Sequence, residues 1–268
     1  MGYAVDTILA FSTQAGASAF PTALAATAGD SLTIRATRGE SKAHIEAIIT
    51  GSNAGGQKFR ITSPLLHDNV TGLTFQPGEN PAPFLLPLES SVEVNELDTL
   101  AAFGQCSGAT TITMGIVVQY DDLRGTAADL YRWSDIASDI KQYKSVEVSL
   151  SAVAVGAWTD TAITNTEDQL HADRSYAVLG YDVNPAVDIV GVKGVATGNL
   201  RMCGPGPNSS LRISDYFVSQ SIENNMPYIP VFQANDRRAF FVSAANHAAI
   251  AGGAAEVFLL VAELKSKK

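Results

Sequence analysis

The chain has 268 residues, of which 46% are hydrophobic and only 17% are charged. This composition excludes intrinsic disorder, which requires low hydrophobicity combined with high net charge, and the length allows one or two domains. The formal net charge of −9 argues against broad nucleic-acid binding, because an acidic surface repels phosphate. No basic residue precedes Arg35 and no apolar run reaches about 18 residues, so neither a secretory signal nor a membrane-spanning helix is expected.

Strand patterns dominate the first half of the chain. Residues 32–38 alternate apolar and polar side chains, which is the period of a half-buried strand. Residues 110–120 form a β-branched and large apolar run that is typical of the centre of a sheet. Glycine- and proline-rich stretches at 51–56 and 76–81 predict turns. Many short strands with regular turn signals indicate a sandwich or a barrel.

Residues 126–144 have a helical pattern. Thr126 and Asp129 fit a variant of the capping box, and acidic residues precede basic ones along the segment, as the helix dipole favours. The apolar side chains that recur on one helical face are Leu130, Trp133, Ile136, Ala137, Ile140 and Tyr143. The pattern predicts an α-helix over residues 127–143 that packs as a strut between two domains.

Strand signals return in the second half. Residues 146–153 alternate apolar and polar side chains, and residues 255–264 form another apolar run, with turn residues at 204–208. Residues 239–250 fit two interpretations, a short helix that begins near Asn235 or a strand that begins at the aromatic pair 240–241. The sequence leaves this choice open.

Four segments of the first half match four segments of the second half in the same order. The matched pairs are 30–34 with 173–177, 59–61 with 200–202, 83–87 with 227–230, and 112–117 with 257–262. This order indicates an internal duplication. The predicted fold is therefore all-β, with two tandem jelly-roll-like β-sandwiches (residues 1–125 and 145–268) joined by the helix at 126–144.

The sequence contains no recognisable catalytic motif. The four histidines are dispersed, which disfavours a histidine metal centre: His44, His67, His171 and His247. Cys106 and Cys203 are predicted to be small buried apolar residues in a reducing compartment, with a single bridge between them left open. The glycine-rich stretches lack the spacing of phosphate-binding loops and are interpreted as turns.

Charged clusters offer two weaker signals. The acidic pairs Asp121–Asp122 and Glu167–Asp168 could contribute oxygen ligands to Ca²⁺, although solvated loops are the simpler interpretation, and no other cofactor is expected. Three lysines form the one basic cluster near the C-terminus: Lys265, Lys267 and Lys268. This segment is interpreted as a solvated tail or, functionally, as an anchor to the phosphates of a lipid or a genome.

The duplicated order that begins at Asp30 and Asp173 and ends in the runs 112–117 and 257–262 resembles the double-jelly-roll major capsid proteins of tailless icosahedral viruses. The resemblance is architectural and covers the whole chain, so it transfers no active-site residue. It implies a structural protein and not an enzyme, in the form of a homotrimer whose six sandwiches tile an icosahedral shell. The implied partners are neighbouring trimers, a penton or minor capsid protein and an internal membrane, with no specific nucleic acid. The implied location is the virion, after assembly in the host cytoplasm.

Two other classes of protein fit the same pattern. One is a two-domain jelly-roll enzyme of the bicupin or amidase type, which a bound metal or clustered carboxylates in a cleft would favour. The other is a carbohydrate-binding or adhesive module, which requires an exposed aromatic platform. Because Trp133 is assigned to the predicted helix, only Trp158 is available as a tryptophan for such a platform.

Overall fold

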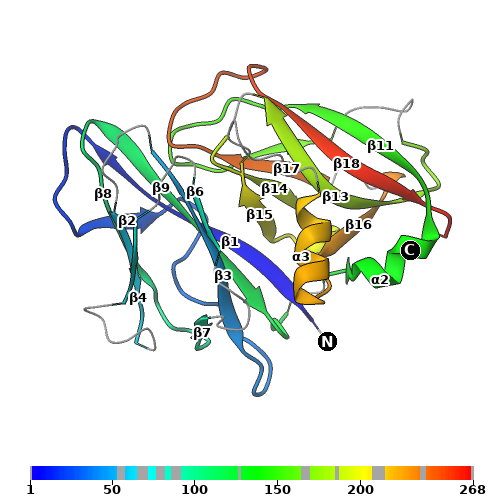
Figure 1. Ribbon diagram of the computed structural model, residues 1–268, viewed down its shortest axis with the longest axis horizontal. Helices are drawn as coiled ribbons and strands as arrows, with labels where there is room; N and C mark the ends of the chain where they lie inside the picture. The colour runs from blue at the N-terminus through cyan, green and yellow to red at the C-terminus, as the bar shows by residue number, and fades with distance from the viewer. Residues whose placement is uncertain are drawn as a thin grey trace.

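The computed structural model describes residues 2–52, 58–64, 72–76, 82–85, 92–125, 128–163, 170–184, 187–206, 215–235 and 240–266. The described chain is mostly antiparallel β-structure with short helices, so the predicted all-β class is confirmed. Figure 1 shows the first half of the chain as one sandwich on the left and the second half as another on the right. Within the described ranges, no helix has the length and apolar character that crossing a bilayer requires.

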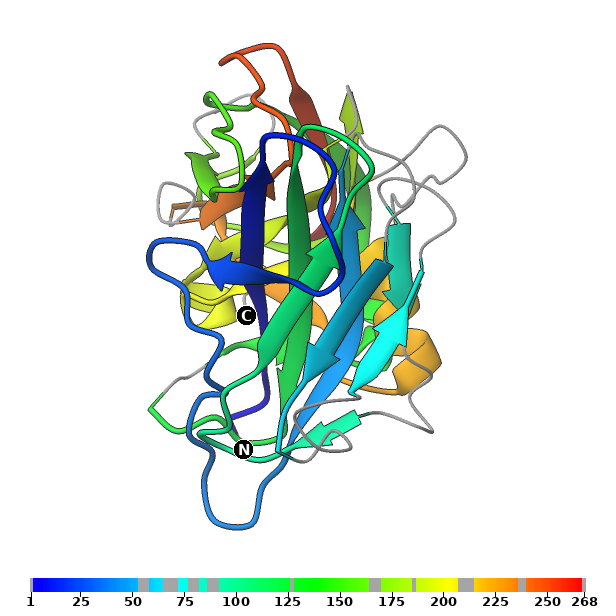
Figure 2. The same cartoon turned by 90° about the vertical axis from the view of Figure 1, so that its left-hand side faces the viewer.

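The first half forms two layers of strands. Its strands are β1 (Ala4–Gln14), β2 (Thr22–Ala26), β3 (Ala43–Gly51), β4 (Lys58–Thr62), β5 (Leu73–Phe75), β6 (Ala82–Leu85), β7 (Val92–Val94), β8 (Ala101–Gln105) and β9 (Thr110–Tyr120). One layer has the order β1–β9–β3–β6 and the other has the order β2–β8–β4–β5, while β7 pairs with β3. The pairing of β1 with β2 makes the two layers continuous at one edge. Figure 2 shows these strands in front of the second half.

The second half forms two further sheets. Its strands are β10 (Leu130–Tyr131), β11 (Ile140–Ser149), β12 (Thr159–Ala162), β13 (Ser175–Asn184), β14 (Ile189–Gly194), β15 (Arg201–Pro205), β16 (Ile229–Gln233), β17 (Phe240–Ala245) and β18 (Glu256–Leu264). Its helical elements are α2 (Trp133–Ile136), α3 (Tyr216–Asn224) and the 3₁₀ turns η2 (Ala137–Asp139) and η3 (Val195–Thr197). The sheets have the orders β10–β16–β13–β18–β11 and β12–β17–β14–β15.

The two halves share one strand order. The layer β1–β9–β3–β6 corresponds to β11–β18–β13–β16, and the layer β2–β8–β4–β5 corresponds to β12–β17–β14–β15. In each half the eight equivalent strands, counted along the chain, are ordered 1-8-3-6 in one sheet and 2-7-4-5 in the other. This is the connectivity of a jelly roll, an eight-stranded sandwich built from two Greek keys. The predicted pair of tandem jelly rolls is therefore present.

Two of the four matched sequence pairs fall on equivalent strands. Residues 112–117 and 257–262 lie in β9 and β18, and the pair 83–87 and 227–230 leads to β6 and β16. Each of these strands has the same place in its own sheet. Long apolar runs at a sheet centre are distinctive enough to mark the repeat.

The other two matched pairs are wrong. Residues 59–61 lie in β4, whose counterpart is β14, whereas 200–202 lead into β15. Residues 30–34 precede β3, whereas 173–177 already enter β13. The alternation of apolar and polar side chains recurs in every half-buried strand, so a match of three to five residues does not identify which strand it belongs to.

The predicted helix over residues 127–143 is also wrong in its extent. Residues 126–127 lie outside the described part, α2 has only four residues, and β11 begins at Ile140. The reason is tertiary: β11 pairs with β18 from Ile140 to Ser149, and this ladder satisfies the backbone of the second half of the predicted helix. The strand period then replaces the helical period, with Val146 and Val148 buried.

The predicted apolar face of this segment is only partly buried. Ile136 is fully buried, and Leu130, Trp133 and Ile140 are partly buried against the core of the second jelly roll. Tyr143, by contrast, is 59% exposed. The segment that joins the jelly rolls therefore packs against the second one through the residues around α2. The predicted packing of Tyr143 is wrong.

Truncation of Ile136 and of Tyr143 should distinguish the helical interpretation of this segment from the strand interpretation. We expect Ile136→Ala to lower the free energy of unfolding by about 2–5 kcal/mol, because it leaves a cavity in the core. Tyr143→Ala should change it by less than about 0.5 kcal/mol, because the side chain is exposed. Chemical denaturation of both variants measures the difference. Equal losses would mean that the continuous helix forms in solution.

The remaining sequence predictions have mixed outcomes. Residues 110–120 and 255–264 are strands as predicted, and the strand alternative for 239–250 is correct from Phe240 to Ala245. Residues 32–38 form isolated bridges at Thr33 and Thr37 instead of a strand. The helix α3 was not predicted from the sequence.

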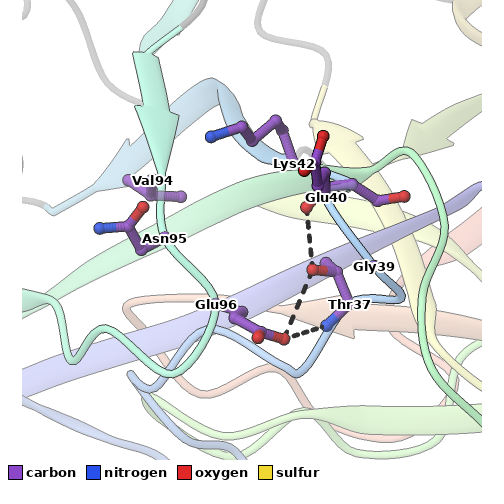
Figure 3. A pocket seen from close by; sticks show the side chains of 8 residues that line it. Thr37, Gly39, Glu40, Lys42, Val94, Asn95 and Glu96 are labelled. Atoms are coloured by element: carbon purple, nitrogen blue, oxygen red, sulfur yellow. Dashed lines mark hydrogen bonds between the residues drawn. The ribbon is translucent and has the colours of Figure 1, made fainter.

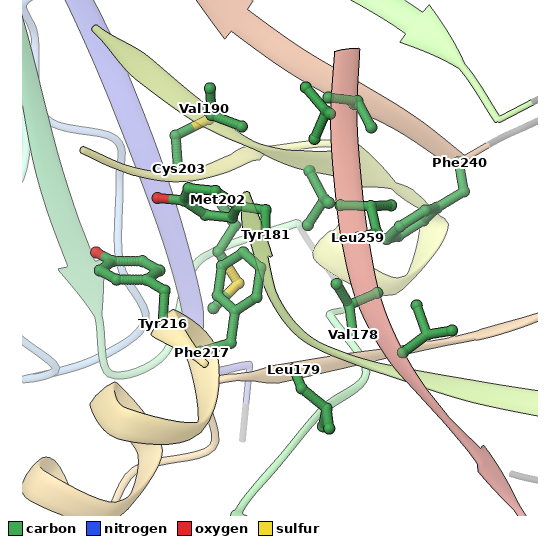
Figure 4. Close-up of a cluster of buried hydrophobic side chains, with 14 of the residues drawn as sticks. Val178, Leu179, Tyr181, Val190, Met202, Cys203, Tyr216, Phe217, Phe240 and Leu259 are labelled. Carbon is green, nitrogen blue, oxygen red and sulfur yellow. The ribbon is translucent and has the colours of Figure 1, made fainter. Parts of the chain in front are cut away.

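Helix α3 supplies large side chains to the core of the second jelly roll. Tyr216 and Phe217 lie beside Tyr181 of β13, with ring centroids 5.7 and 5.8 Å from the Tyr181 ring (Figure 4). All three side chains are buried. Aromatic side chains bury more area than any others, so this cluster contributes strongly to the stability of the second jelly roll.

Candidate functional site: the interface between the jelly rolls

The sheet β1–β9–β3 of the first jelly roll is buried on both of its faces. On one face, Ala4 and Ile8 of β1 belong to the core of the first jelly roll. On the other face, Val5 and Leu9 belong to the core of the second. Strands β14 and β15 cover this second face, since residues of β1 and β9 contact β15. The four sheets of the chain are therefore stacked, and this interface lies in the middle of the stack.

A small residue allows the two sheets to approach closely. A Cβ atom on Gly115 of β9 would lie 2.6 Å from Cδ1 of Ile189 on β14. Nearby, the hydroxyl of Thr7 accepts a hydrogen bond from the backbone N–H of Cys203, at 3.1 Å. At this point of the interface a backbone group of one jelly roll therefore meets a side chain of the other.

Asp188 forms one polar cluster in this interface. Its carboxylate is 2% exposed; it accepts hydrogen bonds from the hydroxyl of Thr113 on β9, at 3.1 Å, and from the backbone N–H of His247, at 2.7 Å. The Nδ1 atom of His247 lies 2.8 Å from the same carboxylate oxygen. A Cβ atom on Gly51 would lie 2.0 Å from that oxygen, so only glycine fits here. Asp188 therefore connects the two jelly rolls through a site shaped around its carboxylate.

Arg201 forms a second cluster at the edge of the interface. Its guanidinium lies 2.8 Å from Asp160 and 3.4 Å from Asp30, which belongs to the first half of the chain. The indole N–H of Trp158 donates to Asp30 at 2.7 Å, and the guanidinium stacks on the indole at 5.0 Å. Burial alone would raise the pKa of Asp160, but hydrogen bonds from Arg201, Ser243 and Lys193 outweigh burial and lower this pKa. The indole of Trp158 is committed to this interface.

Glu46 of β3 forms the third cluster. Its side chain is 5% exposed, and one carboxyl oxygen accepts a hydrogen bond from the hydroxyl of Tyr228, at 3.2 Å. The other oxygen has no hydrogen-bond partner within the described structure. Burial raises the pKa of Glu46 to about 7, although the hydrogen bond from Tyr228 lowers it. The interface therefore contains a carboxyl group that titrates near neutral pH.

Two open hollows lie outside this interface. One, of about 310 Å³, lies at the joint between the jelly rolls and is lined by Tyr3, Asp121, Ala128, Leu130, Arg132, Met226 and Pro227. The other, of about 440 Å³, lies at one end of the first jelly roll (Figure 3). There, the carboxylate of Glu96 accepts a hydrogen bond from the backbone N–H of Thr37, at 2.8 Å. This carboxylate closes a turn, which is a structural role.

The structure describes one of the two acidic pairs that could contribute ligands to Ca²⁺. Asp122 accepts a hydrogen bond from the backbone N–H of Gly2, and Asp121 lies 3.5 Å from His44. The second pair, Glu167 and Asp168, lies outside the described residues. Among the described residues, no group of three histidine, cysteine, aspartate or glutamate side chains is placed to hold a metal ion.

The cysteines are buried and free, as predicted for small apolar residues, and the alternative of a bridge between them is wrong. Burial raises the pKa of the Cys203 thiol well above its usual value, so this thiol is protonated at neutral pH. Its place against Thr7 gives it a packing role in the interface.

The basic cluster at the C-terminus is only partly described. Lys265 follows β18, and its ammonium donates to the carbonyl of Ser138 in η2, at 3.1 Å. Its backbone N–H donates to the carbonyl of Asp139, at 2.8 Å. Lys267 and Lys268 lie outside the described residues. The described part of the tail is therefore attached to the joint of the second jelly roll.

Sequence reasoning missed the residues that form the interface. Glu46 and Asp188 both interrupt apolar runs that become buried strands or their edges, and an acidic residue in such a run is the available signal. Comparisons with protein-family models, with curated proteins and with solved structures found no match to this chain. The function must therefore be argued from the geometry of the chain itself.

Proposed function

We propose that this chain is a structural subunit of a viral capsid, which assembles as a homotrimer and tiles an icosahedral shell in the virion. The observation that supports the proposal is that one chain holds two jelly rolls with the same strand order, docked through a shared core. Two similar domains in a fixed orientation let three chains imitate sixfold packing. A single subunit can then cover a nearly flat facet.

The contact between the jelly rolls joins two different faces, and such a contact can be repeated around a ring. It joins the β1–β9–β3 sheet of one jelly roll to the β14–β15 sheet of the other, and these two faces are not equivalent. Such a heterologous contact closes into a ring when successive rotations complete a full turn, and otherwise it continues as a filament. Six jelly rolls from three chains form the ring of a pseudo-hexagonal tile.

Under this proposal, the chain binds other copies of itself within a trimer, and each trimer binds neighbouring trimers. The structure disfavours the adhesive alternative, because that function requires Trp158 as an exposed platform. The indole of Trp158 instead donates to Asp30 and stacks on Arg201. A tryptophan engaged in this way is not available to stack on a sugar.

The oligomeric state of the full chain tests the proposal. Sedimentation or light scattering at micromolar concentration should give three times the mass of the chain, and negative-stain images should show tiles with six lobes. A strictly monomeric protein at all salt and calcium concentrations, or a dimer with twofold symmetry, would contradict the capsid function.

A further inference from the structure

Equivalent faces of the two jelly rolls differ in how far they are covered. In the first jelly roll, β9 is buried on both faces along almost its whole length. Its neighbour β1 is buried from Ala4 to Ala10. In the second jelly roll, β11 is the equivalent of β1 and alternates, with Val146 and Val148 buried and Glu147 between them exposed. Strand β18, the equivalent of β9, is half-buried at Glu256, Phe258 and Leu260 and buried from Val261 to Leu264. The first jelly roll therefore has this face covered by the second, whereas in the second jelly roll the part of the face around Glu147, Phe258 and Asp182 is open to solvent.

The uncovered face of the second jelly roll is apolar with an acidic border. In the ladder β11–β18–β13, Phe258 pairs with Glu147 on one side and with Asp182 on the other. Both carboxylates are exposed, whereas Phe258 and its neighbour Leu260 are half-buried. We call the face that these four residues define, with the apolar pair in the middle and a carboxylate on each side, the acidic face. Two lysines further along β11 are paired with the buried carboxylate of Glu263.

At the opposite end of the stack, no element of the described residues covers the outer face of the first jelly roll, which is basic and aromatic. On the sheet β2–β8–β4, Arg60 pairs in register with Phe103, and its guanidinium lies 4.7 Å from the centre of that ring. The ammonium of Lys58 lies 4.8 Å from the centre of the Phe20 ring. We call this face the basic face. It lies on the left of Figure 1, away from the second jelly roll, whereas β11 and β18 lie on the right.

One ion pair across the contact inside the chain has the same polarity as these two faces. There, the sheet of the second jelly roll that covers β1 supplies the base, Arg201 of β15. The first jelly roll supplies the acid, Asp30, whereas the nearby Asp6 pairs with Arg35 of its own jelly roll. In both cases an acid on the side that carries β1 or β11 corresponds to a base on the opposing sheet, although inside the chain Asp160 of the second jelly roll also pairs with Arg201.

We propose that the acidic face of one chain docks on the basic face of a second copy, so that the contact between subunits repeats the contact inside the chain. This inference rests on the proposed trimer and deepens it by naming the two surfaces that meet. Opposite charges at the border steer the faces together and set their register, while the half-buried aromatic and aliphatic side chains supply the area.

Charge reversal with rescue tests this docking. The variant Glu147→Lys with Asp182→Lys makes both faces basic, and we expect the concentration at half-assembly to rise by roughly tenfold or more. The variant Lys58→Glu with Arg60→Glu makes both faces acidic and should have the same effect. The variant with all four substitutions restores opposite charges and should assemble as the unaltered protein does.

A matched control separates docking from overall charge. Glu40→Lys with Glu223→Lys makes the same change in net charge at two exposed residues outside both faces, and it should leave assembly unchanged. Thermal melting of each variant shows whether it folds. If the substitution of Arg60 prevents folding, the variant with Glu147→Lys and Asp182→Lys alone tests the docking. A trimer that is indifferent to this reversal would overturn the inference and leave the capsid function standing. An unaltered chain that does not form trimers would overturn both.

Discussion

Replacing Glu46 with glutamine should remove a pH-dependent loss of stability of about 3 kcal/mol between pH 4.5 and 7. The carboxyl group is buried between the jelly rolls, where burial raises its pKa from 4.5 to about 7. Below pH 4.5 the folded and unfolded chains both hold the proton, so the contribution of Glu46 is fully present. Between pH 4.5 and 7 the unfolded chain loses this proton first, so stability falls, and each unit of pKa difference corresponds to about 1.4 kcal/mol. Above pH 7 the curve is flat again for this group.

Denaturation of both proteins from pH 4 to 8 measures this effect as a difference between the two stability curves. The difference isolates Glu46, because the other titrating groups are common to both proteins. The groups that interact with Glu46 are phenols, Tyr228 by hydrogen bond and Tyr216 and Tyr3 at longer range, and none of them titrates below pH 8. The variant Glu223→Gln, at an exposed residue outside the interface, is the matched control. If the difference in unfolding free energy between Glu46→Gln and the unaltered protein does not change with pH, the carboxyl group of Glu46 is exposed to water in solution.

This titration acts on the contact that supports the proposed assembly. Glu46 lies in β3 and its hydrogen-bond partner Tyr228 precedes β16, so the ionised carboxylate weakens the docking of one jelly roll on the other. A trimer that repeats this contact depends on a fixed angle between its two jelly rolls. Assembly should therefore be more robust in mildly acidic solution than above pH 7.

The sequence predicts the repeated parts of the fold better than the parts that connect them. The apolar runs of β9 and β18 are long enough to identify a sheet centre and to show the duplication. The joint was predicted wrongly because residues 140–143 fit both a helical and a strand period. Pairing with β18, more than 110 positions away, decides between the two, as the pairing of Ile140 with Leu264 shows. No local window contains this information.

The interface residues were beyond prediction for the same reason. Glu46 and Tyr228 are separated by 182 positions, and Thr113 and Asp188 by 75. An acidic residue inside an apolar run indicates only that something must satisfy it, because a buried charge without partners is costly. Its partner becomes visible only when the two jelly rolls are docked.

Removing the carboxylate of Asp188 should have the largest effect on the docked pair of jelly rolls. We expect Asp188→Ala to lower the free energy of unfolding by about 3–5 kcal/mol, because it leaves the His247 N–H and the His247 ring without their buried partner and removes one of the two acceptors near the Thr113 hydroxyl. Asp182→Ala, on the exposed side of β13, should cost less than about 0.5 kcal/mol. Chemical denaturation of both variants measures these losses.

The part of this loss that belongs to the contact between jelly rolls can be measured through Thr113. This hydroxyl reaches Asp188 from the first jelly roll, whereas both bonds with His247 lie within the second. Thr113→Val alone should cost about 0.5–1.5 kcal/mol. In the double variant with Asp188→Ala the two losses should sum to more than the observed loss, since the shared hydrogen bond can be lost only once. Strict additivity would show that Asp188 stabilises the second jelly roll alone and that the docking depends on the apolar contacts around Gly115 and Ile189.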